Sequence, residues 1–166
     1  MPAQRPRPAT GHAARCRSPQ PRLRTAPRLA VQGQSRFADL PARSTLARWI
    51  AAAGATDAEI TLRFVGAAEG RRLNRTFRGK DSATNVLTFA YAQAPRVQAD
   101  IVLCVPVLRR EAREQKKAFR DHLAHLVVHG VLHALGHDHD RAAAARKMEA
   151  LEVTVLAALG VPNPYR

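Results

Sequence analysis

The sequence contains too few cysteines for a disulfide framework. Its two cysteines are Cys16, in a segment rich in proline and arginine, and Cys104, at the end of an apolar run. Small domains that depend on disulfides carry several pairs and belong to oxidising compartments. We therefore expect a cytoplasmic protein in which Cys104 is a small buried hydrophobic residue.

Long apolar segments are also lacking. No run approaches the roughly 20 apolar residues of a membrane-spanning helix, and no hydrophobic stretch is typical of a secretory signal. We therefore expect no membrane partner. A chain of 166 residues is long enough to bury the core of one domain.

Acidic residues are scarce relative to basic ones, 13 against 27, so the net charge is +14. Residues 1–28 contribute seven arginines and no acid to this surplus. A surplus of positive charge favours a polyanionic partner, nucleic acid first, because binding neutralises phosphates and releases counterions. The alternative is that arginine follows a biased genome and serves only solubility.

Residues 1–27 have almost no apolar periodicity, and we interpret them as a disordered basic tail. Three interpretations of this tail stay open: a nucleic-acid-binding arm, an organelle transit peptide, or a start assigned too far upstream. We favour a dispensable tail. Residues 28–166 are then expected to form a single domain.

The patterns in residues 28–166 predict an α+β domain, with a small, mostly four-stranded sheet packed by about five helices. Alternating or continuous apolar residues predict an edge strand at 29–31 and further strands at 60–64, 87–91 and 100–104. Helices are expected from Ser44 as N-cap to Gly54, at 67–75, at 106–117, around 123–135 as the central helix, and at 141–159. In the last helix, four residues are expected to face inward: Met148, Leu151, Val155 and Leu159.

The most informative segment is HGVLHALGHDH, residues 129–139. His129 and His133 are four residues apart, so both project from one face of a helix. Gly136 can end the helix and reverse the chain, which would bring His139 to the open side of that pair. Three imidazoles with one open position are typical of a catalytic zinc site. The alternative is a polar strip on a packed helix, which the third histidine behind a glycine makes less favoured.

The spacing also matches the zinc-binding helix of metzincin proteases, with one difference. The residue after the first histidine is Gly130, where those proteases have the glutamate that serves as general base. Glycine cannot accept a proton. The metal site is therefore expected to be retained, and peptide hydrolysis is not.

Three segments together resemble the YbeY family of rRNA maturation factors: FRGKDSATNVLTFAY at 77–91, HLVVHGVLHALGHDHD at 125–140, and KMEALE at 147–152. The resemblance extends over residues 28–166. It implies a metal-dependent, single-strand-specific endoribonuclease in small-subunit (16S) rRNA 3′-end maturation and ribosome quality control. It also implies the 30S subunit with its ribosomal proteins as partners, and no small-molecule cofactor.

The resemblance further implies that His129, His133 and His139 are the metal ligands and that Arg78 is the catalytic arginine. A guanidinium stays protonated and can bind two non-bridging phosphate oxygens, and Lys80 adds a second cation. The alternative for Arg78 is a solvated arginine of the turn, paired with Asp81.

Further residues are candidates for supporting contacts. His137 stands where the family usually has tyrosine, which puts a fourth imidazole near the site. Three carboxylates, of Asp138, Asp140 and Asp100, could orient imidazole N–H groups, and the alternative is that they cap helices or lie on the surface. His125 lies one turn before His129 and could line the site, although a satisfied histidine of a packed helix is the preferred interpretation.

The general base, the metal and the function class stay open at this point. The base could be a hydroxide on the metal, an imidazole such as His137, or the RNA 2′-OH. Zn²⁺ is favoured, but nickel, cobalt and copper also bind imidazoles. The alternatives to an endoribonuclease are a ribosome assembly factor that acts by binding RNA and ribosomes, and another metal-dependent hydrolase.

Overall fold

The structure is a computed structural model, and it describes residues 26–93, 96–137 and 141–166. The predicted tail lies almost entirely outside these residues, as do Asp138, Asp140 and the expected ligand His139.

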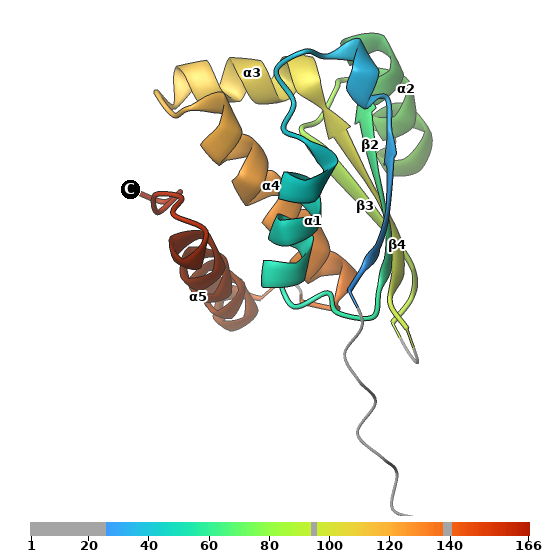
Figure 1. The fold of residues 1–166 in the computed structure, drawn as a ribbon. Coiled ribbons are helices and arrows are strands. Elements are labelled where there is room, and N and C mark those ends of the chain that lie inside the picture. The colour runs from blue at the N-terminus through green and yellow to red at the C-terminus, as the bar shows by residue number, and fades with distance from the viewer. Residues whose placement is uncertain (1–25, 94–95, 138–140) are drawn as a thin grey trace, which may run out of the picture.

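A four-stranded mixed sheet forms the centre of the molecule (Figure 1). Its strands are β1 (Arg28–Gln32), β2 (Glu59–Val65), β3 (Val86–Ala92) and β4 (Gln98–Cys104), in the order β1-β2-β4-β3. β1, β2 and β4 run parallel, and β3 pairs antiparallel with β4. The expectation that β1 is an edge strand and that β4 is central is confirmed.

Five α-helices surround the sheet within the described part of the chain: α1 (Arg43–Ala52), α2 (Ala67–Arg78), α3 (Val105–Glu114), α4 (Phe119–Ala134) and α5 (Ala142–Ala158). A short 3-10 helix, η1, spans Gln34–Arg36. In Figure 1, α1 and α4 lie on one side of the sheet and α2 on the other, with α5 outside α4. The predicted α+β class with a central α4 is confirmed. None of the described helices is long and apolar enough to cross a membrane.

The main core lies between the sheet and α4, because both present apolar residues at the right period. On β2, Ile60, Leu62 and Phe64 alternate inward, and α4 presents residues such as Leu123 and Val127 to them. A smaller apolar cluster lies on the α2 side of the sheet and includes Cys104. Burial raises the pKa of the Cys104 thiol, so this cysteine is the inert hydrophobic residue that was expected.

Several predicted helix boundaries are wrong by a few residues. α1 begins at Arg43 with Ala42 as the cap residue, so Ser44 lies in the first turn and is not the N-cap. α2 continues to Arg78, three residues beyond the predicted end. α3 ends at Glu114, and Lys116 then adopts a left-handed conformation with φ of 54°, which helix cannot accommodate.

One predicted inward residue of α5 is also wrong. Leu151 is 39% exposed, whereas its neighbour Glu152 is completely buried. The inward face of α5 contains Met148, Glu152 and Leu156, which are spaced four residues apart. A carboxylate therefore occupies the position next to α4 where the apolar pattern predicted leucine.

Candidate active site

α4 carries three histidines on the side that does not face the sheet. His125, His129 and His133 are each four residues apart and follow one another along the helix. Their ring centroids are separated by 6.2 Å between the first two and by 4.7 Å between His129 and His133. All three are half-buried, because the opposite face of the helix supplies the core. The predicted proximity of His129 and His133 is confirmed.

The C-terminal end of α4 has the reversal that was predicted at Gly136. This glycine has a φ of 89°, and its N–H donates to the carbonyl of His133 at 2.9 Å. The N–H of His137 donates to the carbonyl of Leu132 at 3.0 Å. These two bonds form a Schellman motif, which turns the chain away from the helix axis. His137 is exposed, and the placement of His139 stays a prediction.

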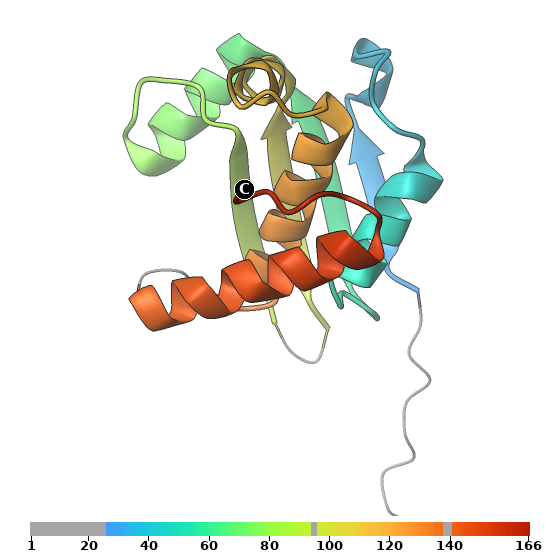
Figure 2. The same cartoon turned by 90° about the vertical axis from the view of Figure 1, so that its left-hand side faces the viewer.

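The functional residue that the sequence reasoning missed is Glu152 of α5. Its carboxylate lies between two histidines of α4. The distance from Oε1 to Nδ1 of His129 is 2.6 Å, and the distance from Oε2 to Nε2 of His125 is 3.2 Å. The hydroxyl of Tyr165 also donates to Oε2. In Figure 2 the C-terminal segment that carries this tyrosine returns across α4.

The hydrogen bonds around Glu152 keep its carboxylate ionised. Burial by itself would raise the carboxyl pKa, but hydrogen bonds from His125, His129 and Tyr165 outweigh burial and lower the pKa to about 2. Burial and the neighbouring carboxylate raise the pKa of the Tyr165 phenol, so this group stays a neutral donor. An ionised carboxylate accepts hydrogen bonds and cannot donate them, so both imidazole nitrogens that face it must carry a proton.

His125, His129 and Glu152 also form a group that could hold a metal ion, since their donor atoms all lie within 4.8 Å of one another. Their present spacing is that of hydrogen bonds. Two ligands of one tetrahedral zinc ion, each about 2.0 to 2.2 Å from the metal, lie roughly 3.3 Å or more apart. The 2.6 Å between His129 Nδ1 and Glu152 Oε1 is shorter than that.

Gly130 packs α4 tightly against the sheet. A Cβ atom at this position would come within 2.8 Å of Cγ2 of Ile101 and 3.2 Å of Oγ1 of Thr88. A larger side chain therefore has no room at the position after the first histidine. Packing thus agrees with the sequence in arguing against the glutamate of a metalloprotease.

Arg78 is the last residue of α2, and Gly79 ends the helix with a φ of 69°. The turn that follows is held from α2: Arg71 forms two hydrogen bonds with the carboxylate of Asp81, and Asn74 donates to the carbonyl of Ser82 at 2.7 Å. Asp81 therefore pairs with Arg71, and the alternative pairing with Arg78 is wrong.

Arg78 and Lys80 are both exposed. Neither forms a hydrogen bond or an ion pair with a residue of the described ranges, so no such contact joins them to the histidines. The turn that carries them precedes β3, the element with which α4 has its most extensive contact. Arg78 thus lies at the end of α2, before the turn that leads to β3, and its guanidinium is available to a ligand.

The start of β3 is fixed by a second polar network. The side-chain amide of Asn85 donates to the carboxylate of Glu111 on α3, and its oxygen accepts from the N–H of Val86. The same carboxylate lies 2.9 Å from Nε2 of His122 on α4. Asn85 therefore links the turn after Arg78 to α3 directly and to α4 through Glu111.

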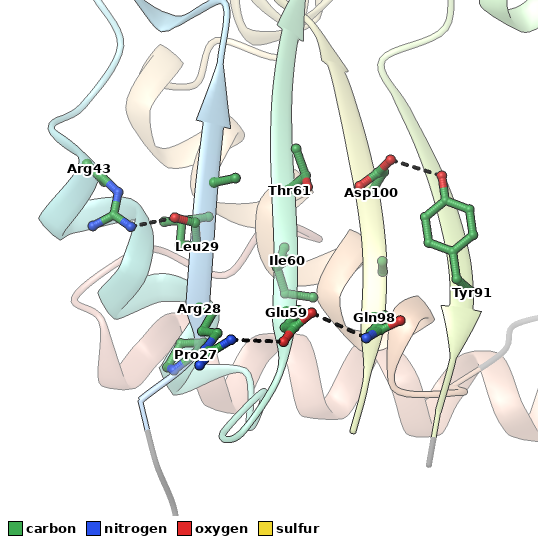
Figure 3. A pocket seen from close by; sticks show the side chains of 12 residues that line it. Pro27, Arg28, Leu29, Arg43, Glu59, Ile60, Thr61, Tyr91, Gln98 and Asp100 are labelled. Atoms are coloured by element: carbon green, nitrogen blue, oxygen red, sulfur yellow. Dashed lines mark hydrogen bonds and ion pairs between the residues drawn. The ribbon is translucent and has the colours of Figure 1, made fainter. Parts of the chain in front are cut away.

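Asp100 does not support the histidines, which corrects the expectation that it could orient an imidazole. Neighbouring residues of a strand point to opposite faces, and Ile101 contacts α4 at Gly130. Asp100 therefore lies on the other face of the sheet, where its carboxylate accepts a 2.9 Å hydrogen bond from Tyr91 (Figure 3).

Comparison with known proteins gives a consistent result. The family model described as Endoribonuclease YbeY matches residues 34–160. A protein of that name from Aromatoleum aromaticum is 56% identical over 133 residues, which cover 80% of this chain and 86% of the relative. The protein of the same name from Bordetella pertussis is 56% identical over 149 residues, covering 82% and 94%.

A solved structure also resembles the fold. The solution structure of TM1509 from Thermotoga maritima superposes with a TM-score of 0.52 at 23% identity, over 79% of this chain and 91% of the other. At this identity the likeness concerns the fold alone.

Proposed function

This chain belongs to the YbeY endoribonuclease family, and we propose that it hydrolyses single-stranded RNA at a metal ion held by His129, His133 and His139. The observation that carries the metal site is the buried carboxylate of Glu152 on Nδ1 of His129. Histidines that bind a metal characteristically donate their other ring nitrogen to such a carboxylate.

The donor set fits a divalent ion, most simply Zn²⁺. Three imidazoles are the ligands of a catalytic zinc site that leaves one position open. His129 and His133 are already neighbours on α4, and the helix ends in a Schellman turn at Gly136, three residues before His139 in the sequence. When bound, the ion would supply a nucleophilic water of lowered pKa and polarise a phosphoryl oxygen.

Arg78 would bind the phosphate that is attacked. Its guanidinium is exposed and forms no hydrogen bond or ion pair within the described part of the chain, so substrate need not displace a partner. Negative charge develops on the non-bridging oxygens during hydrolysis, and a bidentate cation stabilises that charge. Lys80, two residues later in the same turn, would contact a neighbouring phosphate.

The biological substrate proposed here is ribosomal RNA, at the 3′ end of the 16S species, reached through the 30S subunit and its proteins. The net charge of +14 supports a polyanionic substrate. This role would place the protein in the cytoplasm, where ribosomes assemble.

The test of catalysis is cleavage of a single-stranded oligoribonucleotide by wild-type protein and two variants whose metal content is measured in the same preparations. Arg78→Ala is expected to keep its metal and to cleave about 100-fold more slowly, the usual loss of one charge-stabilising group. His133→Ala is expected to lose both metal and cleavage. Arg72→Ala removes the same charge from an exposed position of the same helix and is expected to cleave nearly normally.

The test of the biological role is 16S rRNA processing in cells depleted of the endogenous protein. Wild type and Arg72→Ala are expected to restore the mature 3′ end, and Arg78→Ala is not. If Arg78→Ala restores maturation fully, the protein acts by binding to ribosomes and the proposed catalytic role is wrong. Equal cleavage by rigorously metal-free protein would contradict the metal-dependent mechanism.

A further inference from the structure

We propose that Glu152 is the positioning residue of the metal centre: its carboxylate holds Nδ1–H of His129 and so directs Nε2 of that ring to the metal. The inference rests on the proposed function, in which His129 is a ligand. It adds a residue on α5, 23 positions away in sequence, to a site whose expected ligands in the described part of the chain both lie on α4.

The first argument is the geometry of the contact. The 2.6 Å between Oε1 and Nδ1 is a short hydrogen bond, slightly below the roughly 2.7 to 2.9 Å of charge-assisted N–H···O⁻ bonds. The carboxylate can only accept, so Nδ1 carries the hydrogen and Nε2 is the nitrogen with a lone pair for a metal. The contact therefore selects one tautomer and one orientation of His129.

The second argument is that the carboxylate is itself immobilised. Its other oxygen, Oε2, faces Nε2 of His125 at 3.2 Å and accepts from the hydroxyl of Tyr165. The three donors come from α4 and from the C-terminal segment, so Glu152 cannot rotate without breaking several bonds. A fixed acceptor is what a positioning role requires.

The third argument is the cost of the arrangement. Glu152 is 0% exposed, and an ionised side chain that is removed from water destabilises the fold unless its partners compensate. Leucine at this position of α5 would satisfy the apolar pattern of the helix and pack against α4 without that cost. A buried charge that contacts an expected metal ligand is therefore explained better by the metal than by stability.

The experiment measures Zn²⁺ affinity by competition with a chromogenic chelator, on full-length protein of verified fold. The variants are Glu152→Gln, which keeps the size and removes the charge, and Glu149→Gln, which makes the same change at an exposed position of α5. His133→Ala serves as the ligand-loss reference. We expect Glu152→Gln to bind Zn²⁺ about 10- to 100-fold more weakly than wild type, the range typical for partners of metal ligands. Glu149→Gln should bind like wild type.

The outcomes separate this inference from the proposed function. Equal affinity of Glu152→Gln and wild type would overturn the positioning role and leave the ligand set intact. Affinity that survives His133→Ala but is abolished by Glu152→Gln would make Glu152 a ligand and overturn both. A wild-type protein that binds no Zn²⁺ would refute the proposed metal site itself.

A second measurement needs no variant, so it holds even if Glu152→Gln does not fold. Imidazole ¹⁵N correlation spectra of the metal-free wild-type protein report which nitrogen of each histidine carries the proton. We expect His129 to be protonated at Nδ1. When Zn²⁺ is added, we expect the ¹⁵N chemical shift of its Nε2 to change. A signal from His129 with the proton on Nε2 alone would overturn the proposal.

Discussion

Contacts with other elements explain why residue 130 is glycine and residue 152 is glutamate. Gly130 is in the middle of α4, where glycine weakens a helix, yet the sheet leaves no space for a Cβ atom. Glu152 is on the inward face of α5, where a charge is unfavourable, yet two imidazoles of α4 face it. In each case a local cost is accepted because the residue sets how α4 is placed or how its histidines are oriented.

The substitution Gly130→Ala tests the packing of α4. In an exposed helix this change stabilises by about 1 kcal/mol, because alanine is the better helix former. Here the new methyl group would press on Ile101, a branched side chain of the core, and overpacking of this kind costs about 1 to 3 kcal/mol. We expect the overpacking to prevail and the free energy of unfolding to fall by about 1 kcal/mol.

The measurement is chemical denaturation of metal-free wild type and Gly130→Ala, since bound metal would add its own stabilisation. The sign of the change in the free energy of unfolding shows whether overpacking or helix propensity prevails. A variant more stable than wild type would show that α4 can move away from β4 at little cost.

At the scale of elements, the turn between α2 and β3 determines where Arg78 lies relative to β3. Arg71 and Asp81 close this turn from one side, and Asn85 anchors its far end to Glu111. The ion pair is exposed, and exposed pairs contribute little to overall stability. Its importance would instead be to restrict the positions that Arg78 can take.

Asp81→Ala should therefore slow catalysis more than it affects folding. We expect kcat for cleavage of single-stranded RNA to fall by about three- to tenfold, because small misplacements of a group that contacts the transition state are costly. The measurement is a single-turnover rate at saturating RNA, together with the melting temperature.

The control is Asp39→Ala, which breaks a somewhat less exposed pair with two hydrogen bonds, to Arg109, away from this turn. It should leave kcat unchanged, and the two variants should have similar melting temperatures. If both variants lower kcat alike, the effect is one of charge and the turn does not position Arg78.

Much of this arrangement could be predicted from the sequence, because strands, α4 and the Gly136 turn depend on local patterns. The residues that could not be predicted depend on partners distant in sequence. The apolar spacing of α5 favoured Leu151, and only the packing of α5 on α4 shows that Glu152 faces the histidines. Likewise Asp100 could be assigned to a face only once Ile101 was seen against Gly130. The prediction that Ser44 is the N-cap is wrong because the helix already begins at Arg43, directly after Ala42, whose ψ of 152° is not helical.

At the scale of the whole molecule, the sheet and α4 form a rigid support for a small polar site. The basic surplus is a separate property, shared between the domain and residues 1–25, which hold six arginines and no acid. Charge of this kind acts on RNA affinity through counterion release and does not depend on the metal centre. Affinity and catalysis should therefore respond differently to salt and to removal of these residues.

Deletion of residues 1–25 tests this separation. We expect kcat, metal content and melting temperature to stay at wild-type values, and KM for single-stranded RNA to rise at low salt. Each phosphate contact contributes about −0.7 to the slope of log affinity against log salt concentration for single strands. Loss of six arginines can therefore make the slope less negative by up to roughly four, and the difference in KM should vanish at high salt. An unchanged slope would show that these arginines do not contact RNA, whereas a fall in kcat would show that residues 1–25 belong to the catalytic unit.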